Sequence, residues 1–250
     1  MDRISATIIT KNAADTIERC LCSLVGIADE IIIVDSYSTD STLDICRRYG
    51  CKITQREFSG FGSQRQYAVG LATYNYILSI DADEVLTEGA RQSIMEVKSN
   101  GFPSKIYSLR VVSYFCGKAM KHSGWAPTQE VRFFNRRYAH WDLLDIDEGV
   151  TYPDSRIAHP LAGEIQHYRC ASVEEFDHKE QRRAAIMARV IAARNRRPFS
   201  PTLLACWHYL HCHIRQGAWL DGKPGNIIAL RRFSTIRKAY TKARNESKAI

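Results

Sequence analysis

The chain has 250 residues, of which 45% are hydrophobic and 25% charged, a composition typical of a folded soluble protein that excludes a disordered or fibrous one. Its net charge of +8 is uneven, because residues 179–250 hold 16 Lys and Arg against 3 Asp and Glu, a balance of +13, whereas residues 1–178 carry 19 against 24, a balance of −5. A basic tail is able to bind either nucleic acid or an anionic membrane surface. Apolar residues lie between the basic ones, as in LLACWHYL, so we expect the tail to contact a membrane and not to bind nucleic acid.

The cysteines and the apolar segments indicate where the protein works. The eight cysteines form no CxxC pair, and the opening MDRISATII lacks the regions of a signal peptide, so we expect reduced thiols in a cytoplasmic protein. No apolar run reaches the ~20 residues that cross a bilayer, so we expect only peripheral contact with the cytoplasmic face of the inner membrane. The cluster HYLHCH at 208–213 matches no standard zinc spacing, which favours helix packing over a metal site.

In chain order, the first hundred residues alternate between apolar strands and helices. We predict helices at 15–24, 41–49, 63–72 and 88–98, between and after strands at 4–10, 30–35, 51–54 and 75–81. Because the strands are apolar and separated by helices, they predict an α/β fold whose mainly parallel sheet is covered on both faces.

The rest of the chain changes character twice. Residues 105–152 mix β-rich stretches with Gly and Trp loops, which indicates an extension of the sheet and a wall for an acceptor. From residue 172 the pattern is that of basic amphipathic helices, interrupted at DGKPGN. We therefore predict a domain at 1–171, with halves of about 1–100 and 101–171, and a basic helical extension at 172–250.

Three of the predicted strands end in polar or acidic groups. The first strand ends at Thr10, with Asn12 just beyond it; the second ends at Asp35, and the fourth ends at Asp81, with Asp83 just beyond it. Because ligands of such sheets bind beyond the carboxyl ends of the strands, these groups should converge on one crevice. Carboxylate oxygens there suit Mg²⁺ or Mn²⁺ held jointly with a diphosphate. The alternative is that the paired acids only cap the helix that follows.

Motifs spread over nearly the whole chain resemble a known family. The stretches are ATIITKN, IIVDSYSTDST, GFGSQRQYAVGLA, ILSIDADE, HSGWAPTQEVRFF and GAWLDGKPG. Together they resemble the family 2 glycosyltransferases of the GT-A fold, most closely the lipopolysaccharide core glycosyltransferases of the WaaE/KdtX type. The resemblance implies a GT-A nucleotide-diphospho-sugar transferase fold with a C-terminal helical extension, and an inverting hexosyltransferase that uses a divalent cation.

The resemblance also implies roles for the side chains around the nucleotide. Thr10 and Asn12 would line the nucleotide pocket. Asp35 would accept a hydrogen bond from uracil, while Asp40 would steady the loop, so we expect Asp35 to serve recognition and Asp40 mainly folding. Substituting Asp35 should then cost little stability.

The same resemblance implies a cation site and a neighbouring helix. Asp83 would bind the metal directly, and Asp81 would face the metal or the ribose. His167 would be a further metal ligand, although a lone histidine is more often structural. Gln64 and Arg65 would approach the nucleotide or the sugar, with a solvated helix face as the alternative.

On the acceptor side, the resemblance points to HSGWAP and IDEGV. Gly124 and Trp125 would bind the acceptor, with Trp125 either stacked on a sugar ring or packed as a core aromatic. Glu148 would be the base that takes the proton from the acceptor hydroxyl. Asp147 stands where the family usually has His, so it competes for that role, alters acceptor choice, or only forms a polar turn.

Arg132, in EVRFF, alternates with apolar neighbours as a strand residue does. It would pair with a phosphate of the donor or the acceptor, and a surface-strand arginine is the alternative.

These expectations combine into one function. The chain would transfer a sugar, with UDP-glucose as the family-based choice of donor, to a lipopolysaccharide core or related cell-surface glycolipid. Alternatives with a similar donor half are transfer to polyprenyl phosphate or to a capsular or exopolysaccharide acceptor. A non-catalytic nucleotide-sugar-binding or scaffold protein is a further alternative.

Overall fold

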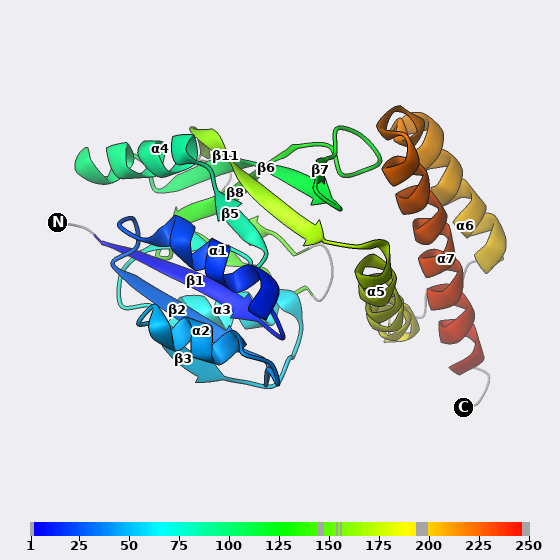
Figure 1. The fold of residues 1–250 in the computed structure, drawn as a ribbon, viewed down its shortest axis with the longest axis horizontal. Helices are drawn as coiled ribbons and strands as arrows, with labels where there is room; N and C mark the ends of the chain where they lie inside the picture. Colours follow the sequence, from blue (N-terminus) through cyan, green and yellow to red (C-terminus); the bar gives the residue numbers. More distant parts are fainter. Residues whose placement is uncertain (1–2, 145–147, 154, 156, 194–199, 247–250) are drawn as a thin grey trace. The chain divides into compact units, whose positions relative to one another are not determined.

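The computed structural model describes residues 3–144, 148–153, 155, 157–193 and 200–246 (Figure 1). By its internal contacts the chain divides into two compact units. The first is Met1–Val111 with Thr128–His167, and the second is Val112–Pro127 with Tyr168–Ile250. The predicted domain boundary after residue 171 stays a prediction.

The first half of the sheet is parallel. Among the described residues, nine strands form one sheet in the order β3-β2-β1-β4-β8-β6-β11-β5, with β7 paired to β6. The register sets Thr10 beside Asp35 and Thr7 beside Ser79, so the carboxyl ends of β2, β1 and β4 are neighbours at one edge. The parallel strands are β1 (Ile4–Thr10), β2 (Glu30–Asp35), β3 (Lys52–Gln55) and β4 (Tyr76–Ser79).

Antiparallel pairs extend the sheet beyond β4. Strand β8 runs antiparallel to both β4 and β6, and β11 runs antiparallel to β5, which places His167 beside Glu84. The sheet is therefore mixed rather than mainly parallel. The strands of this half are β5 (Glu84–Leu86), β6 (Ile106–Phe115), β8 (Thr128–Asn135) and β11 (His159–Cys170), while β9 (His140–Trp141) and β10 (Val150–Thr151) form a separate hairpin.

Helices cover both faces of the parallel half, as the apolar strands predict. Successive strand residues point to opposite faces, so Ile33 packs in one core with α1, α2 and α4, whereas Ile32 packs in the other with α3. The helices are α1 (Ala14–Leu24), α2 (Thr42–Arg48), α3 (Phe61–Leu71) and α4 (Glu88–Ser99). This burial fixes the strand ends, and hence the loops that carry the polar residues.

The second unit is mainly helical. Its core gathers Phe115, Met120 and Phe176, and both α5 and α6 pack on α7 (Figure 1). Among the described residues, no helix combines the length and the apolar character needed to span a membrane. The elements are β7 (Lys118–Ala119), α5 (Val173–Ala193), α6 (Pro201–Leu210), a π-helical turn (His211–Arg215), a 3-10 turn (Ala218–Asp221) and α7 (Lys223–Glu246).

The prediction of an α/β fold of the GT-A type with a C-terminal helical region is confirmed. The observed architecture is a mixed sheet flanked by helices, and further helices follow it in the chain. The histidines of HYLHCH pack as predicted, since His211 stacks on Trp207 and His213 stacks on Tyr209.

Candidate active site

The loop after β2 is organised by Asp35. Its side chain is fully buried and accepts hydrogen bonds from the Ser38 backbone N–H at 2.9 Å, from Ser38 Oγ at 2.5 Å and from Gln55 Nε2 at 3.1 Å. Both carboxylate oxygens are thus engaged in folding the turn. Asp35 lies at the predicted nucleotide edge, but it also carries a folding task that the sequence assigned mainly to Asp40.

The loops after β1 and β2 are bonded to each other. Asn12 has a positive φ of 50°, and its Oδ1 accepts from the Thr39 N–H at 2.8 Å while its own N–H donates to Ser38 Oγ at 2.8 Å. Asp40 accepts from the N–H of Ala14 and from Thr42. Asp40 therefore links the start of α1 to the start of α2, in keeping with its predicted role in steadying the loop.

Arg65, on α3, joins the strand-end acid to the predicted base. Its Nη2 donates to both carboxylate oxygens of Asp81 at 2.8 Å each, and its Nη1 donates to Glu148. The guanidinium also lies over the Trp141 ring, with Cζ 4.8 Å from the ring centroid. Arg65 is thus a buried, fully used cation in the site, rather than a residue of a solvated helix face.

The position of Glu148 follows from the β9–β10 hairpin. The neighbouring Gly149 donates to Asp142 Oδ2 at 3.0 Å, and the Asp142 N–H donates back to the Gly149 carbonyl at 2.9 Å. These bonds close the hairpin and hold Glu148 beside Arg65. The other candidate base, Asp147, lies outside the described residues.

A second buried arginine, Arg132 on β8, pairs with the acids Asp81 and Glu84 and balances their negative charge. Its Nη2 lies 2.8 Å from Glu84 and its Nη1 lies 3.8 Å from Asp81. Burial opposes ionisation of Asp81, yet Arg65 and Arg132 outweigh it and hold the pKa of Asp81 well below its usual range. Burial raises the pKa of Glu84, and the charge of Asp81 adds to that rise while Arg132 opposes it.

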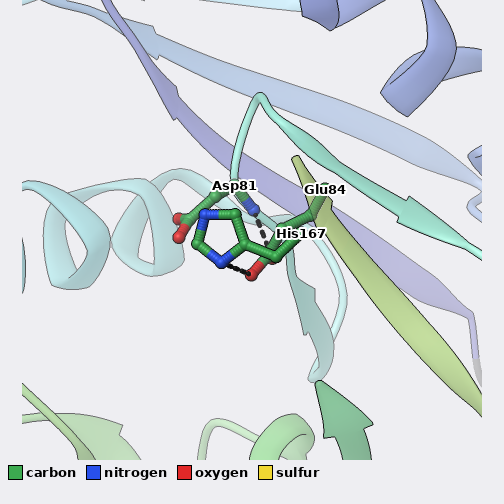
Figure 2. Close-up of side chains that lie close together, drawn as sticks. All are labelled: Asp81, Glu84 and His167. Atoms are coloured by element: carbon green, nitrogen blue, oxygen red, sulfur yellow. Dashed lines mark hydrogen bonds and ion pairs between the residues drawn. The ribbon is translucent and has the colours of Figure 1, made fainter. Parts of the chain in front are cut away.

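His167 lies between two carboxylates. Its Nε2 is 3.2 Å from Asp83 Oδ1, and its Nδ1 is 3.3 Å from Glu84 Oε1 without the alignment of a hydrogen bond. Figure 2 shows the ring of His167 beside Asp81 and Glu84, and the Asp81 backbone N–H donates to Glu84 Oε2 at 2.9 Å. The ligand atoms of Asp81, Glu84 and His167 lie within 4.8 Å of one another.

This cluster has the donor set for a divalent cation. Two ligands that share a small hard cation at right angles are about 3 Å apart, given ligand distances near 2.1 Å, and Asp83 Oδ1 and His167 Nε2 match that spacing. A metal-binding histidine is typically oriented by a carboxylate at its other nitrogen, the position that Glu84 takes here. The residues fit the predicted cation, with Glu84 as an addition that the sequence interpretation missed although it belongs to ILSIDADE.

Several buried polar atoms near the strand ends have no hydrogen-bond partner among the described residues. They are Thr10 Oγ1, Gln64 Oε1 and Arg132 Nη1. Because buried polar groups in folded proteins are nearly always bonded, such atoms mark a place where a ligand or water completes the bonding. Thr10 and Gln64 belong to the predicted donor site, and Arg132 was predicted to pair with a phosphate of the donor or the acceptor.

The remaining predicted residues, Gly124 and Trp125, lie in the second unit. Gly124 has a positive φ of 71°, which suits glycine. Trp125 packs at edge-to-face angles against Phe176, and Arg169 lies over its ring. Packing of this kind is the core-aromatic alternative raised for Trp125, and its role toward an acceptor stays a prediction.

The motif WLDGKPG acquires a structural role from Asp221. This buried carboxylate accepts from the N–H groups of Lys121 and His122 at 3.2 and 3.0 Å, and from Ser123 Oγ at 2.7 Å. Its own carbonyl accepts from Lys118 Nζ at 2.9 Å. Asp221 therefore fixes the backbone that leads into Gly124. This role could not be predicted from the sequence, because the bonded residues lie about 100 positions apart.

Comparison with known families agrees with this architecture. The family described as glycosyl transferase family 2 matches residues 5–151, a span that contains the strand-end acids, Arg65 and Glu148. The chain belongs to this family and is a glycosyltransferase.

Individual relatives are similar over most of the chain. An uncharacterized glycosyltransferase of Rickettsia felis is 43% identical over 263 residues, covering 98% of this chain and 93% of that protein. The lipopolysaccharide core biosynthesis glycosyltransferase LpsC of Rhizobium meliloti is 26% identical over 255 residues, covering 95% of this chain and 92% of that protein. Among solved structures, S. aureus TarS 1–349 matches with 13% identity and a TM-score of 0.42, covering 98% of this chain and 92% of that one.

Proposed function

We propose that this glycosyltransferase moves a hexose, with UDP-glucose as the first donor to test, to a lipopolysaccharide core or related glycolipid, with inversion at the anomeric carbon. The observation that carries donor binding is the strand-end cluster of Asp81, Glu84 and His167. Arg132 Nη1 lies 3.8 Å from Asp81 and has no hydrogen-bond partner among the described residues. The similarity to LpsC over 95% of the chain supports the acceptor class.

In the proposed reaction Glu148 is the general base. The acceptor hydroxyl oxygen forms a bond to the anomeric carbon as the bond from that carbon to the diphosphate breaks, and the hydroxyl proton passes to the Glu148 carboxylate. Arg65 forms an ion pair with Glu148 and orients its carboxylate. Asp147 is the second candidate for the base.

The remaining residues would bind the donor. Thr10, Asn12 and Asp35 would contact the nucleotide, and Gln64 and Arg65 would approach the nucleotide or sugar. Arg132 would pair with a phosphate through Nη1, which has no hydrogen-bond partner in the described part of the chain. Asp83 and His167 would hold Mg²⁺ or Mn²⁺, with Asp81 nearby. When bound, such a cation neutralises negative charge on the leaving diphosphate.

We further propose that the enzyme works on the cytoplasmic face of the inner membrane, where a glycolipid acceptor is accessible. The balance of +13 over residues 179–250 supports attraction to anionic lipid. Gly124 and Trp125 would contribute to binding the acceptor.

The donor half is tested by thermal unfolding of the whole chain with a panel of nucleotide sugars, each with Mg²⁺ or Mn²⁺, because a ligand specific for the folded state raises the melting temperature. We expect one nucleotide sugar to raise it, and Asp83→Asn to remove the cation-dependent part. Asp44→Asn, at an exposed acid of α2, is the matched control. If no nucleotide sugar of the panel raises the melting temperature of the wild type, the donor-site proposal is wrong.

The acceptor half needs a separate measurement. Transfer of labelled sugar is compared between lipopolysaccharide core glycolipid, polyprenyl phosphate and polysaccharide acceptors. Label on the core glycolipid alone supports the proposal, and label on either of the others replaces it with the corresponding alternative.

A further inference from the structure

Helix α6 and the turn after it carry a stripe of exposed apolar side chains, which we name the α6 stripe: Leu203, Trp207, Leu210 and Ile214. Their exposed fractions are 65%, 57%, 52% and 67%. The spacings of four, three and four residues keep them on one side of the helix. Contiguous apolar surface of this kind is unusual on a soluble protein and marks an interaction site.

The stripe is not the face by which α6 packs in its own unit. Ala205 and Cys212 are fully buried, and Cys212 packs with Ala218 and Ala229, the latter on α7. Helix α6 therefore already buries one apolar side against α7, and the α6 stripe is additional. Just beyond it, Trp219 and Leu220 are also exposed, at 59% and 53%.

The exposed surface around these helices is cationic. Arg215 follows the stripe, and α7 exposes Lys223, Arg237, Lys238 and Arg244. The acid nearest in sequence to the stripe, Asp221, is buried and bonded to the loop at 121–123. The surface thus presents apolar and basic groups without an exposed acid between residues 200 and 244.

We propose that the α6 stripe docks on an anionic phospholipid bilayer, with α6 lying in the headgroup region. Trp and Leu on one side of a helix, with Lys and Arg beside them, are the composition of helices that bind in the membrane interface, and Trp favours that boundary because its ring is apolar and its N–H polar.

A second copy of the chain fits less well. A two-fold interface through this unit sets the same surface against itself, so a segment with a balance of +13 faces another of +13, and like charges across an interface are unfavourable. An anionic bilayer matches the charge and accepts the apolar groups.

The test is flotation of the full chain with vesicles that mix phosphatidylglycerol with phosphatidylcholine, and with vesicles of phosphatidylcholine alone. We expect the wild type to float with the mixed vesicles and Trp207→Ser/Leu210→Ser to bind them at least about tenfold more weakly, because two buried apolar groups are lost. Leu71→Ser/Met95→Ser, at exposed apolar residues of the first unit, is the matched control and should bind as the wild type does.

A charge variant provides the second arm. Arg237→Gln/Lys238→Gln should lower binding to the mixed vesicles by about tenfold or more, since each cation near an anionic surface contributes to binding. Thermal unfolding checks that all variants are folded, and surface substitutions should change stability little.

Two results would overturn the proposal. One is a wild type that does not bind the mixed vesicles, or stripe variants that bind them as well as the wild type. The other is a wild type that sediments as a dimer while Trp207→Ser/Leu210→Ser sediments as a monomer, which would assign the stripe to a second copy. Because the vesicles contain no sugar acceptor and no turnover is measured, the result does not depend on the proposed glycosyl transfer.

Discussion

Arg65 bonds Asp81 and Glu148 at the same time, through two different nitrogens of one guanidinium. All three side chains are nearly buried, with exposed fractions of 9%, 17% and 14%. Charges removed from water are stable only when they are paired and well bonded. The arrangement therefore ties the acid after β4 to the residue that we propose as the base, and it orients both.

If Glu148 is the base, replacing it slows transfer strongly but leaves donor binding in place. We expect Glu148→Gln to lower the transfer rate by about 10²- to 10⁴-fold, the usual contribution of general base catalysis. The nucleotide-dependent rise in melting temperature should persist, because Asp81 still pairs with Arg65. Single-turnover transfer and thermal unfolding measure the two effects. A Glu148→Gln variant with nearly normal transfer would assign the role elsewhere, with Asp147 the next residue to test.

Asp35 should matter for stability as well as for the donor. Replacing it with Ala removes three hydrogen bonds to a buried carboxylate, so we expect the free energy of unfolding to fall by about 2–4 kcal/mol. Urea unfolding measures the change, with Asp44→Ala at an exposed acid of α2 as the control. A loss below about 0.5 kcal/mol would restore the sequence-based expectation that Asp35 serves recognition alone.

Asp221 should be the main polar support of the loop at 121–123. We expect Asp221→Asn to lower the free energy of unfolding by about 2–3 kcal/mol, because one acceptor oxygen becomes a donor that faces N–H groups. Asp177→Asn, which weakens a half-exposed ion pair with Arg231, is the control from the same unit and should cost less than about 1 kcal/mol. If the two substitutions lowered the free energy of unfolding equally, Asp221 would not be the main polar support of this loop.

Glu30 provides a pH-dependent contribution to stability. Burial opposes its ionisation, but hydrogen bonds from Lys52, Ser5 and Thr73 lower its pKa from 4.5 to about 2. Since the pKa is lower in the folded state, the carboxylate stabilises the fold fully above about pH 4.5, and this contribution is lost as the pH falls toward about 2.

The variant Glu30→Gln isolates that contribution. The difference in unfolding free energy between wild type and variant should be about 2 kcal/mol at neutral pH and should shrink steadily below about pH 4.5. Urea unfolding across this range measures it, with the exposed Glu96→Gln as control. A difference that stays constant with pH would show that Glu30 has an ordinary pKa.

The parallel half of the fold was predictable because its signals are local. Strands such as Ile4–Thr10 and Glu30–Asp35 begin and end where the apolar runs do, since burial on both faces requires apolar side chains throughout. The antiparallel half was not predicted in its order. Which of β8, β6 and β11 are neighbours depends on how remote segments return to the sheet, and no local pattern records that.

For the candidate site, the sequence alone determined which residues stand at the strand ends, because the motif ILSIDADE and the loop after Asp35 follow directly from the apolar strands. Only the tertiary structure decided how the polar and charged side chains pair: Arg65 with Glu148 across 83 residues, Ser123 with Asp221 across 98, and His167 between Asp83 and Glu84. The physical reason is that the periodic pattern of apolar residues in the sequence indicates which side chains are buried. The bonding partner of a side chain depends instead on which distant segments of the chain pack against it.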